Sequence, residues 1–195
     1  MKTAREIIET YDGPHVRIME VCGTHTHEIF RLGIRKLLPE QVELISGPGC
    51  PVCVTQVGFI DEAVYLALEC GVTICTFGDL VRVPGTEMSL AGAREKGAKV
   101  RIVYSPVDAE QYAKDHPEEQ VVFLAVGFET TTPASCLAVR KAAEDGLTNF
   151  ALLVANKTMP GAYAALKGSA DVFLYPGHVN AITGTELCES LVEEG

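Results

Sequence analysis

The chain has 195 residues, 47% of them hydrophobic, and a formal net charge of -10. A chain of this length can bury a sizeable core. Its acidic balance excludes the basic stripe with which proteins bind nucleic acid or an anionic membrane surface. No apolar run reaches the roughly 18 residues of a membrane span, and no apolar signal core follows the N-terminal charges. We therefore expect a globular cytoplasmic protein whose seven cysteines are reduced thiols.

The first half of the chain alternates strand-like apolar runs with segments of helical spacing, separated by glycine or proline. Thr55 and Ser89 are predicted to cap two of the helices. Helices are expected at residues 2–11, 28–38, 56–69 and 90–96, and strands at residues 16–21, 42–45, 72–77 and 99–104.

The same alternation resumes after Ser105-Pro106. Helix starts are indicated by cap signals at Asp108 with Gln111, at Thr132-Pro133, and at Thr183 with Glu186. Strands are expected at residues 120–126, 150–155 and 172–175, and helices at residues 108–114, 132–144, 160–166 and after 183.

Seven strands, each followed by a helix or loop, indicate an α/β protein with parallel sheets and helices on both faces. One seven-stranded sheet and two smaller sheets both fit this pattern. We expect two α/β lobes that face each other across a cleft, with the boundary at Ser105-Pro106. The first lobe, residues 1–105, would carry Cys22 and the Cys50/Cys53 loop, and the second, residues 106–195, the loops at 127–133 and 176–179.

Polar or cysteine-bearing loops follow five of the predicted strands. Open α/β sheets bind ligands at the carboxyl ends of their strands, so we expect these loops to form one site, or two sites across a cleft. They begin at Cys22, Gly47, Gly127, Asn156 and Pro176.

The loop at residues 47–53 holds Cys50 and Cys53 between glycines and prolines. Pro48 and Pro51 exclude a helix and stiffen the loop, so the two thiols are held at one place. Thiols at this spacing can close a disulfide or bind a metal ion. The alternative is a tight turn with two buried cysteines that only pack.

Cys22 follows the first strand and precedes Gly23 and Thr24, where a helix is about to begin. The helix dipole stabilises a thiolate at such a position, although buried packing is an alternative reading. Of the nearby His25 and His27, we expect one to serve the site. His25 is favoured because three positions from Cys22 suits a turn.

Glu129, Thr130 and Thr131 follow the fifth strand and indicate a pocket carboxylate with neighbouring hydroxyls, unless Glu129 is simply solvated. His178 either serves a site or caps the following helix. The remaining cysteines lie among apolar neighbours and are predicted to pack in the core. They are Cys70, Cys75, Cys136 and Cys188.

Several chemistries are excluded, because the chain has no P-loop, no intact dinucleotide fingerprint and no Gly-x-Ser-x-Gly nucleophile motif. What remains is thiol and imidazole chemistry. Cys22, Cys50, Cys53 and His25 supply soft ligands for iron, zinc or copper, or a dithiol couple beside a metal thiolate. Whether the protein is itself an enzyme stays open.

Four longer motifs stand out in the chain: Cys-Gly-Thr-His-Thr-His from Cys22, Gly-Pro-Gly-Cys-Pro-Val-Cys from Gly47, Gly-Phe-Glu-Thr-Thr-Thr-Pro from Gly127 and Pro-Gly-His-Val from Pro176. These segments closely resemble motifs of the HypD family of hydrogenase maturation proteins, and the resemblance covers essentially the whole chain. The Gly78-Asp79 and Arg82–Gly85 segments fit as well.

The resemblance implies a scaffold that works with a HypC-like chaperone. On it, iron for [NiFe]-hydrogenase receives two cyanides, from a HypE-like donor, and one carbon monoxide, giving a transient Fe(CN)2CO group. By motif match, Cys22 would ligate the iron, His25 would support it, and Cys50 with Cys53 would form a redox-active pair, with Glu129 also at the site. Residues expected to surround the iron group are Gly23, Thr24, Gly49, Thr130, Thr131 and His178.

The resemblance also implies a [4Fe-4S] cluster bound by a further C-terminal portion. Ligands for that cluster are absent from this chain, so we expect a fragment or a shortened relative. Two alternatives stay open. Cys22, Cys50, Cys53 and His25 could close a structural zinc site, or the Cys-Pro-Val-Cys segment could act as a thiol-disulfide oxidoreductase.

Overall fold

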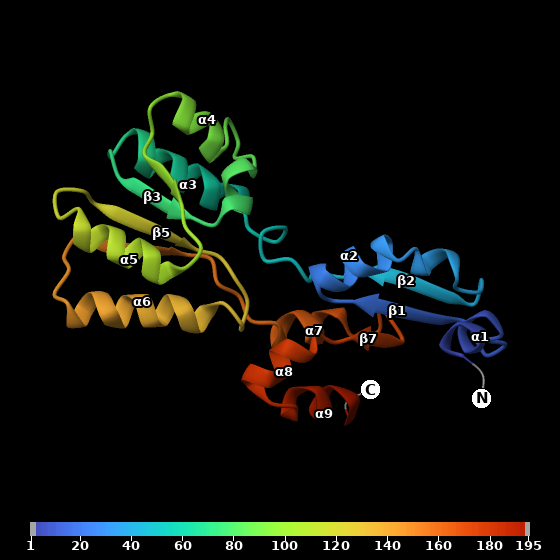
Figure 1. Cartoon of the computed structure of the whole chain (residues 1–195). Helices are drawn as coiled ribbons and strands as arrows, with labels where there is room; N and C mark the ends of the chain where they lie inside the picture. The colour runs from blue at the N-terminus through green and yellow to red at the C-terminus, as the bar shows by residue number, and fades with distance from the viewer. Residues whose placement is uncertain (1–2, 194–195) are drawn as a thin grey trace. The chain divides into compact units, whose positions relative to one another are not determined.

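The computed structural model describes residues 3–193, which fold into two compact units (Figure 1). The terminal unit contains the chain up to Cys50 and the chain from Thr158 onward, and the central unit contains Pro51–Lys157. Each unit is built on its own parallel sheet. The predicted fold class, two α/β lobes with parallel sheets, is therefore confirmed.

The terminal unit has a three-stranded sheet in the order β2-β1-β7, so β1 lies in the middle. Ile18 of β1 is in register with Leu44 of β2 on one side and with Val172 of β7 on the other. The strands are β1 (Val16–Glu20), β2 (Val42–Ser46) and β7 (Val172–Leu174). The helices are α1 (Ala4–Glu9), α2 (Gly23–Arg31), η1 (Ile34–Lys36), α7 (Pro160–Leu166), α8 (Gly177–Thr183) and α9 (Glu186–Glu193).

The central unit has a four-stranded sheet in the order β4-β3-β5-β6. Its strands are β3 (Thr73–Thr76), β4 (Val100–Ile102), β5 (Val121–Ala125) and β6 (Phe150–Val154). Its helices are α3 (Val57–Leu68), η2 (Gly78–Arg82), α4 (Leu90–Glu95), α5 (Pro106–Asp115) and α6 (Thr132–Glu144).

Helices cover both faces of the central sheet, α3 and α4 on one side and α5 and α6 on the other (Figure 1). Side chains of a strand alternate between its two faces, and the core divides accordingly. Ile74 and Leu124 pack with Ile60 of α3, whereas their neighbours Cys75 and Phe123 pack in a second cluster with α5. Both clusters are buried, as expected for a parallel sheet covered on both faces.

The expected lobe boundary at residues 105–106 is not where the two sheets separate. β4 and β5, which flank it, both pair with β3 in one sheet. Ser105 is instead the N-cap of α5 and accepts a hydrogen bond from the Val107 N–H at 3.2 Å, with Pro106 in the first helical turn. The predicted Asp108–Gln111 capping box is therefore wrong. The assignment of the Pro176–Val179 loop to the same lobe as the 127–133 loop is also wrong, because the former lies in the terminal unit and the latter in the central unit.

Other helix boundaries also differ from the sequence expectation. α2 begins at Gly23 rather than Glu28, and it ends before Gly33, whose φ of 63° breaks the helix expected to run to residue 38. The Ser89 cap is confirmed by a bond from the Gly92 N–H. Thr55 and Thr183 do not act as the predicted caps. The Thr55 hydroxyl donates to the Pro51 carbonyl, and Thr183 closes α8.

An ion pair links β7 to the start of β1. Asp171 accepts from the Arg17 backbone N–H at 2.7 Å, and the Arg17 guanidinium lies 3.1 Å from its other oxygen. These bonds hold the pKa of Asp171 below its ordinary value. A carboxyl group whose pKa is lower in the folded state stabilises that state at pH values above its pKa in the unfolded chain, about 3.9. This stabilisation is lost as the pH falls through the folded-state pKa.

We therefore expect Asp171→Asn to flatten the loss of terminal-unit stability between about pH 5 and pH 2. Hydrogen exchange of the β1 and β7 amides measures this. Asp145→Asn is the matched control, because Asp145 has a pKa depressed by Lys114 but lies in the central unit. If the β1 amides lose the same protection from exchange on acidification in the wild type and in Asp171→Asn, the ion pair does not contribute to the stability of the terminal unit.

Candidate functional site: the cysteine loops

Three of the loops singled out in the sequence leave the same edge of the terminal sheet. β1, β2 and β7 are parallel, and they are followed by Cys22, by the loop to Cys50, and by α8 with His178. β1 has β2 on one side and β7 on the other, so its carboxyl end is the point where the strand order reverses. Open α/β sheets bind ligands at such a switch point, and Cys22 lies there.

The loops after β1 and β2 are in direct backbone contact. The Gly23 N–H donates to the Gly49 carbonyl at 3.1 Å. A Cβ on Gly49 would overlap the backbone of Val21 and Cys22, and one on Gly47 would lie 2.8 Å from the Met19 sulfur. Glycine at position 49 is thus required for the cysteine loop to lie against the Cys22 turn.

Cys22 is the N-cap of α2, with extended backbone angles, and its carbonyl accepts from the Thr26 N–H at 3.2 Å. It is 8% exposed and forms no disulfide. A Cβ on Gly23 would lie 4.0 Å from the Cys50 Cβ, so Cys50 is beside the same turn. The thiol of Cys22 is therefore sheltered, close to a second cysteine and at the positive end of a helix.

His25 lies in the first turn of α2, and its Nδ1 is buried without a hydrogen-bond partner in residues 3–193. An unsatisfied buried nitrogen is costly and is common at functional sites. His27 in the same helix is 72% exposed and lies 4.0 Å from Glu28. The preference for His25 agrees with this difference in burial.

Cys53 belongs to the central unit, because the division between the units falls directly after Cys50. Cys50 is half-buried and Cys53 is exposed. The alternative of a turn with two buried cysteines is therefore wrong.

In the central unit, the loops after β5 and β6 lie together. The Lys157 N–H donates to the Gly127 carbonyl at 3.0 Å. Thr131 is the N-cap of α6, and a Cβ on Gly127 would press on its side chain, 2.8 Å from Cγ2. Glu129 and Thr130 lie in this β5–α6 turn. The loops that begin at Cys22 and Pro176 therefore lie in the terminal unit and the Gly127 loop in the central unit, whereas the Gly47 and Asn156 loops cross from one unit into the other.

The four other cysteines do not behave alike. Cys75 of β3 is buried as predicted, and its burial raises the pKa of the thiol to about 11. The core prediction is wrong for Cys70 and Cys136, which are exposed, and for Cys188, which is half-buried. Cys136 lies on the solvent side of α6, whose buried positions are Ser135, Ala138 and Ala142.

Two further features involve none of the predicted residues except Cys188. A cavity of about 410 Å³ lies among α7, β7 and α9 and is lined by side chains that include Tyr163, Phe173 and Cys188. Sequence patterns gave no signal for it, because its walls are short elements of ordinary composition near the end of the chain.

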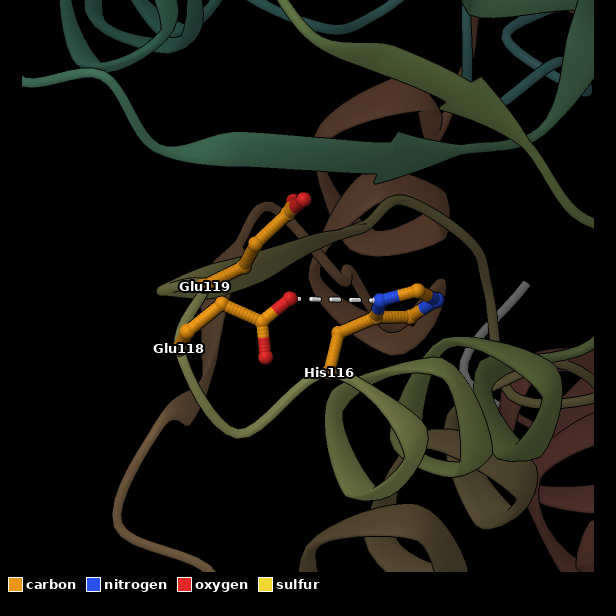
Figure 2. Close-up of side chains that lie close together, drawn as sticks. All are labelled: His116, Glu118 and Glu119. Atoms are coloured by element: carbon orange, nitrogen blue, oxygen red, sulfur yellow. Dashed lines mark ion pairs between the residues drawn. The ribbon is translucent and has the colours of Figure 1, made fainter.

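Figure 2 shows His116, Glu118 and Glu119, whose potential ligand atoms lie within 4.8 Å of one another, the one such group among residues 3–193. Glu119 already accepts bonds from Lys99 at 3.2 Å, from the Tyr112 hydroxyl at 3.3 Å and from Thr73. The group is therefore best described as an ion-pair network, and it lies in the turn between α5 and β5.

Together these features define the class of protein: an α/β protein with two parallel sheets, whose candidate chemistry centres on a sheltered thiol and a second cysteine held beside it. A thiolate with a nearby imidazole suits a soft or borderline metal ion such as iron or zinc. Cys22, His25 and Cys50 do not bring three ligand atoms within 4.8 Å of one another in the described chain.

The family model described as "HypD: Hydrogenase formation hypA family" matches residues 1–195, so the chain belongs to the HypD family. The hydrogenase maturation factor HypD of Rhodobacter capsulatus is 44% identical over 197 residues, covering 99% of this chain and 52% of that protein. HypD of Escherichia coli K12 is 47% identical over 175 residues, covering 88% and 47%. The chain thus spans about half the length of the curated relatives it matches. No helix in residues 3–193 is long and apolar enough to cross a membrane.

Proposed function

We propose that this chain acts in [NiFe]-hydrogenase maturation, as the part of a HypD scaffold that holds iron while the Fe(CN)2CO group is assembled. The observation that carries the proposal is Cys22, a sheltered thiol at the switch point of the terminal sheet, with the Gly49–Cys50 loop against it. Membership of the HypD family supports it, as do the four motifs on which the resemblance rests.

Iron is the substrate in this proposal and Cys22 is its anchor. A thiolate from Cys22 and one from a HypC-like chaperone hold the iron between two proteins, which leaves it transferable. The cyanide comes from a HypE-like donor. Cyanide nitrogens accept hydrogen bonds, and the backbone N–H of Thr24 in the first turn of α2 is a donor close to Cys22 in the chain, whereas the Gly23 N–H is already bonded to the Gly49 carbonyl. His25 supports the bound group.

The other predicted residues have subsidiary roles. Glu129, Thr130 and Thr131, in the turn between β5 and α6, provide polar contacts to the partners, and His178, in α8, provides one to the iron group or to the partners. Cys50 and Cys53 act as a dithiol that exchanges electrons during assembly. Cys50 is half-buried and Cys53 is exposed, so Cys53 is the more accessible of the two residues for thiol exchange.

We expect Cys50 and Cys53 to form a disulfide with one another when the protein is treated with oxidised glutathione. The oxidised glutathione accepts two electrons and two protons and leaves as two glutathione thiols. Their three-residue spacing and the stiff Pro51 turn favour closure. Peptide mass spectrometry of the oxidised protein would identify the link. Cys70 and Cys136, which are also exposed, control for non-specific oxidation. A Cys50–Cys53 link no more abundant than mixed disulfides at those two residues would count against the couple.

Metal analysis of the chain isolated with a HypC-like chaperone tests the proposal. Iron in amounts stoichiometric with the chain is expected. Zinc that survives dialysis, with no iron uptake, would support the structural zinc site instead. Turnover of a disulfide substrate without any metal would support a thiol-disulfide oxidoreductase.

A further inference from the structure

A buried carboxyl group lies two residues before Cys22. Glu20 is the last residue of β1, and its side chain is 0% exposed. Burying a carboxyl group is unfavourable unless hydrogen bonds or charges compensate it, so a residue of this kind usually has partners that matter.

Both oxygens of Glu20 have partners, and the partners come from different elements. The Ser46 hydroxyl at the end of β2 donates to Oε1 at 2.6 Å, and the Thr26 hydroxyl in α2 donates to Oε2. Arg35 of η1 lies 3.8 Å from Oε1 and also donates to the Ser46 hydroxyl at 3.3 Å and to the Leu44 carbonyl at 3.1 Å. One side chain thus joins β1, β2, α2 and η1.

The same residues hold the backbone on either side of the thiol. The Thr26 N–H donates to the Cys22 carbonyl at 3.2 Å, and the Thr26 hydroxyl, which donates to Glu20, also lies 3.4 Å from that carbonyl, so Thr26 ties Cys22 to Glu20. The Glu20 carbonyl accepts from the Gly47 N–H at 2.8 Å, at the start of the loop that carries Cys50.

We propose that Glu20 is a positioning residue for the cysteine site: its carboxyl group clamps the first turn of α2 to the end of β2, and so fixes Cys22 relative to the Cys50 loop. Its role toward iron rests on the proposed function, but its role in holding Cys22 does not. A carboxyl group suits the position because two acceptor oxygens can serve two hydroxyls at once.

The test is the rate at which iodoacetamide alkylates Cys22, followed by peptide mass spectrometry. Because Cys22 is 8% exposed, alkylation requires the turn to open locally. We expect Thr26→Val, which removes the hydroxyl but keeps the volume, to raise the Cys22 rate about tenfold, the effect of losing one buried hydrogen bond. In Thr26→Val the exposed Cys70 and Cys136 should be alkylated at their wild-type rates. Thr26→Ser keeps the hydroxyl, so Cys22 in that variant should be alkylated at the wild-type rate.

Thr73→Val is the matched control, because it removes a Thr–Glu hydrogen bond of the same kind, to Glu119, in the central unit. It should leave the Cys22 rate unchanged. Glu20→Gln should raise that rate as well, and adding Thr26→Val to it should give less than the product of the two single effects, because both act on one bond.

The outcomes separate the inference from the proposed function. Glu20 does not position Cys22 if iodoacetamide alkylates Cys22 no faster in Thr26→Val than in Thr73→Val. The same conclusion follows if the rate increase in the double variant equals the product of the increases in Glu20→Gln and Thr26→Val. If the wild-type chain takes up no iron with its chaperone while the Cys22 rates behave as expected, the proposed function fails and the positioning role stands. Where both hold, Thr26→Val retains less iron than Thr73→Val.

Discussion

Replacing Cys22 with serine is expected to abolish iron retention by the chain while leaving its fold intact. Cys22 offers a sheltered thiol at the N-terminus of α2, whereas Cys50 and Cys53 engage one another in the proposed couple. Serine changes the volume little but removes the soft ligand that iron needs. The free energy of unfolding should change by only about 1 kcal/mol, an ordinary point-mutant effect.

The measurement is the iron content of Cys22→Ser after co-expression with a HypC-like chaperone, together with its urea unfolding curve. Cys136→Ser is the matched control, since Cys136 is an exposed cysteine on α6 with no place in the proposed site. Iron at the wild-type level in Cys22→Ser would show that another residue anchors it.

Gly49→Ala is expected to destabilise the terminal unit strongly, by about 3 kcal/mol, the upper part of the usual range for overpacking. The added Cβ would overlap the backbone of Val21 and Cys22, which cannot rotate away as a flexible side chain would. The β2 loop must then move away from the Cys22 turn. The bond from the Gly23 N–H to the Gly49 carbonyl should be lost with it.

Hydrogen exchange of the β1 and β2 amides measures this change in the terminal unit. Gly23→Ala is the matched control in the neighbouring loop, because its Cβ would find its nearest atoms at 3.9 and 4.0 Å, an ordinary contact. If the β1 amides are equally protected from exchange in the two alanine variants, the close approach at Gly49 is not a constraint on this site.

Much of the fold follows from local patterns in the sequence. The central strands are apolar throughout, as in β5 from Val121 to Ala125, and Ser89 caps α4 as its position indicates. The division into units could not be predicted, because it depends on strand pairing across long stretches of chain. β7 returns to pair with β1 more than a hundred residues later in the chain, and Ser105-Pro106 looked like a boundary although it begins α5.

Residues of the candidate site could be predicted where a cysteine or histidine lies in a loop that also contains glycine. Cys22, Cys50 and His25 were identified in that way, and the structure places them around the start of α2. Glu20 was missed, because a single glutamate at the end of a strand resembles a surface residue. Only the pairing of β1 with β2 and the return of α2 bring Ser46 and Thr26 to its two oxygens.

Infrared spectroscopy of the chain isolated with a HypC-like chaperone, in the presence of a HypE-like cyanide donor, tests the central claim most directly. We expect cyanide and carbon monoxide stretches from iron in the wild type and in Cys136→Ser, and none in Cys22→Ser. Bands of wild-type strength in Cys22→Ser would contradict the assignment of Cys22 as the iron anchor, and a wild-type sample without any such bands would contradict the proposed function itself.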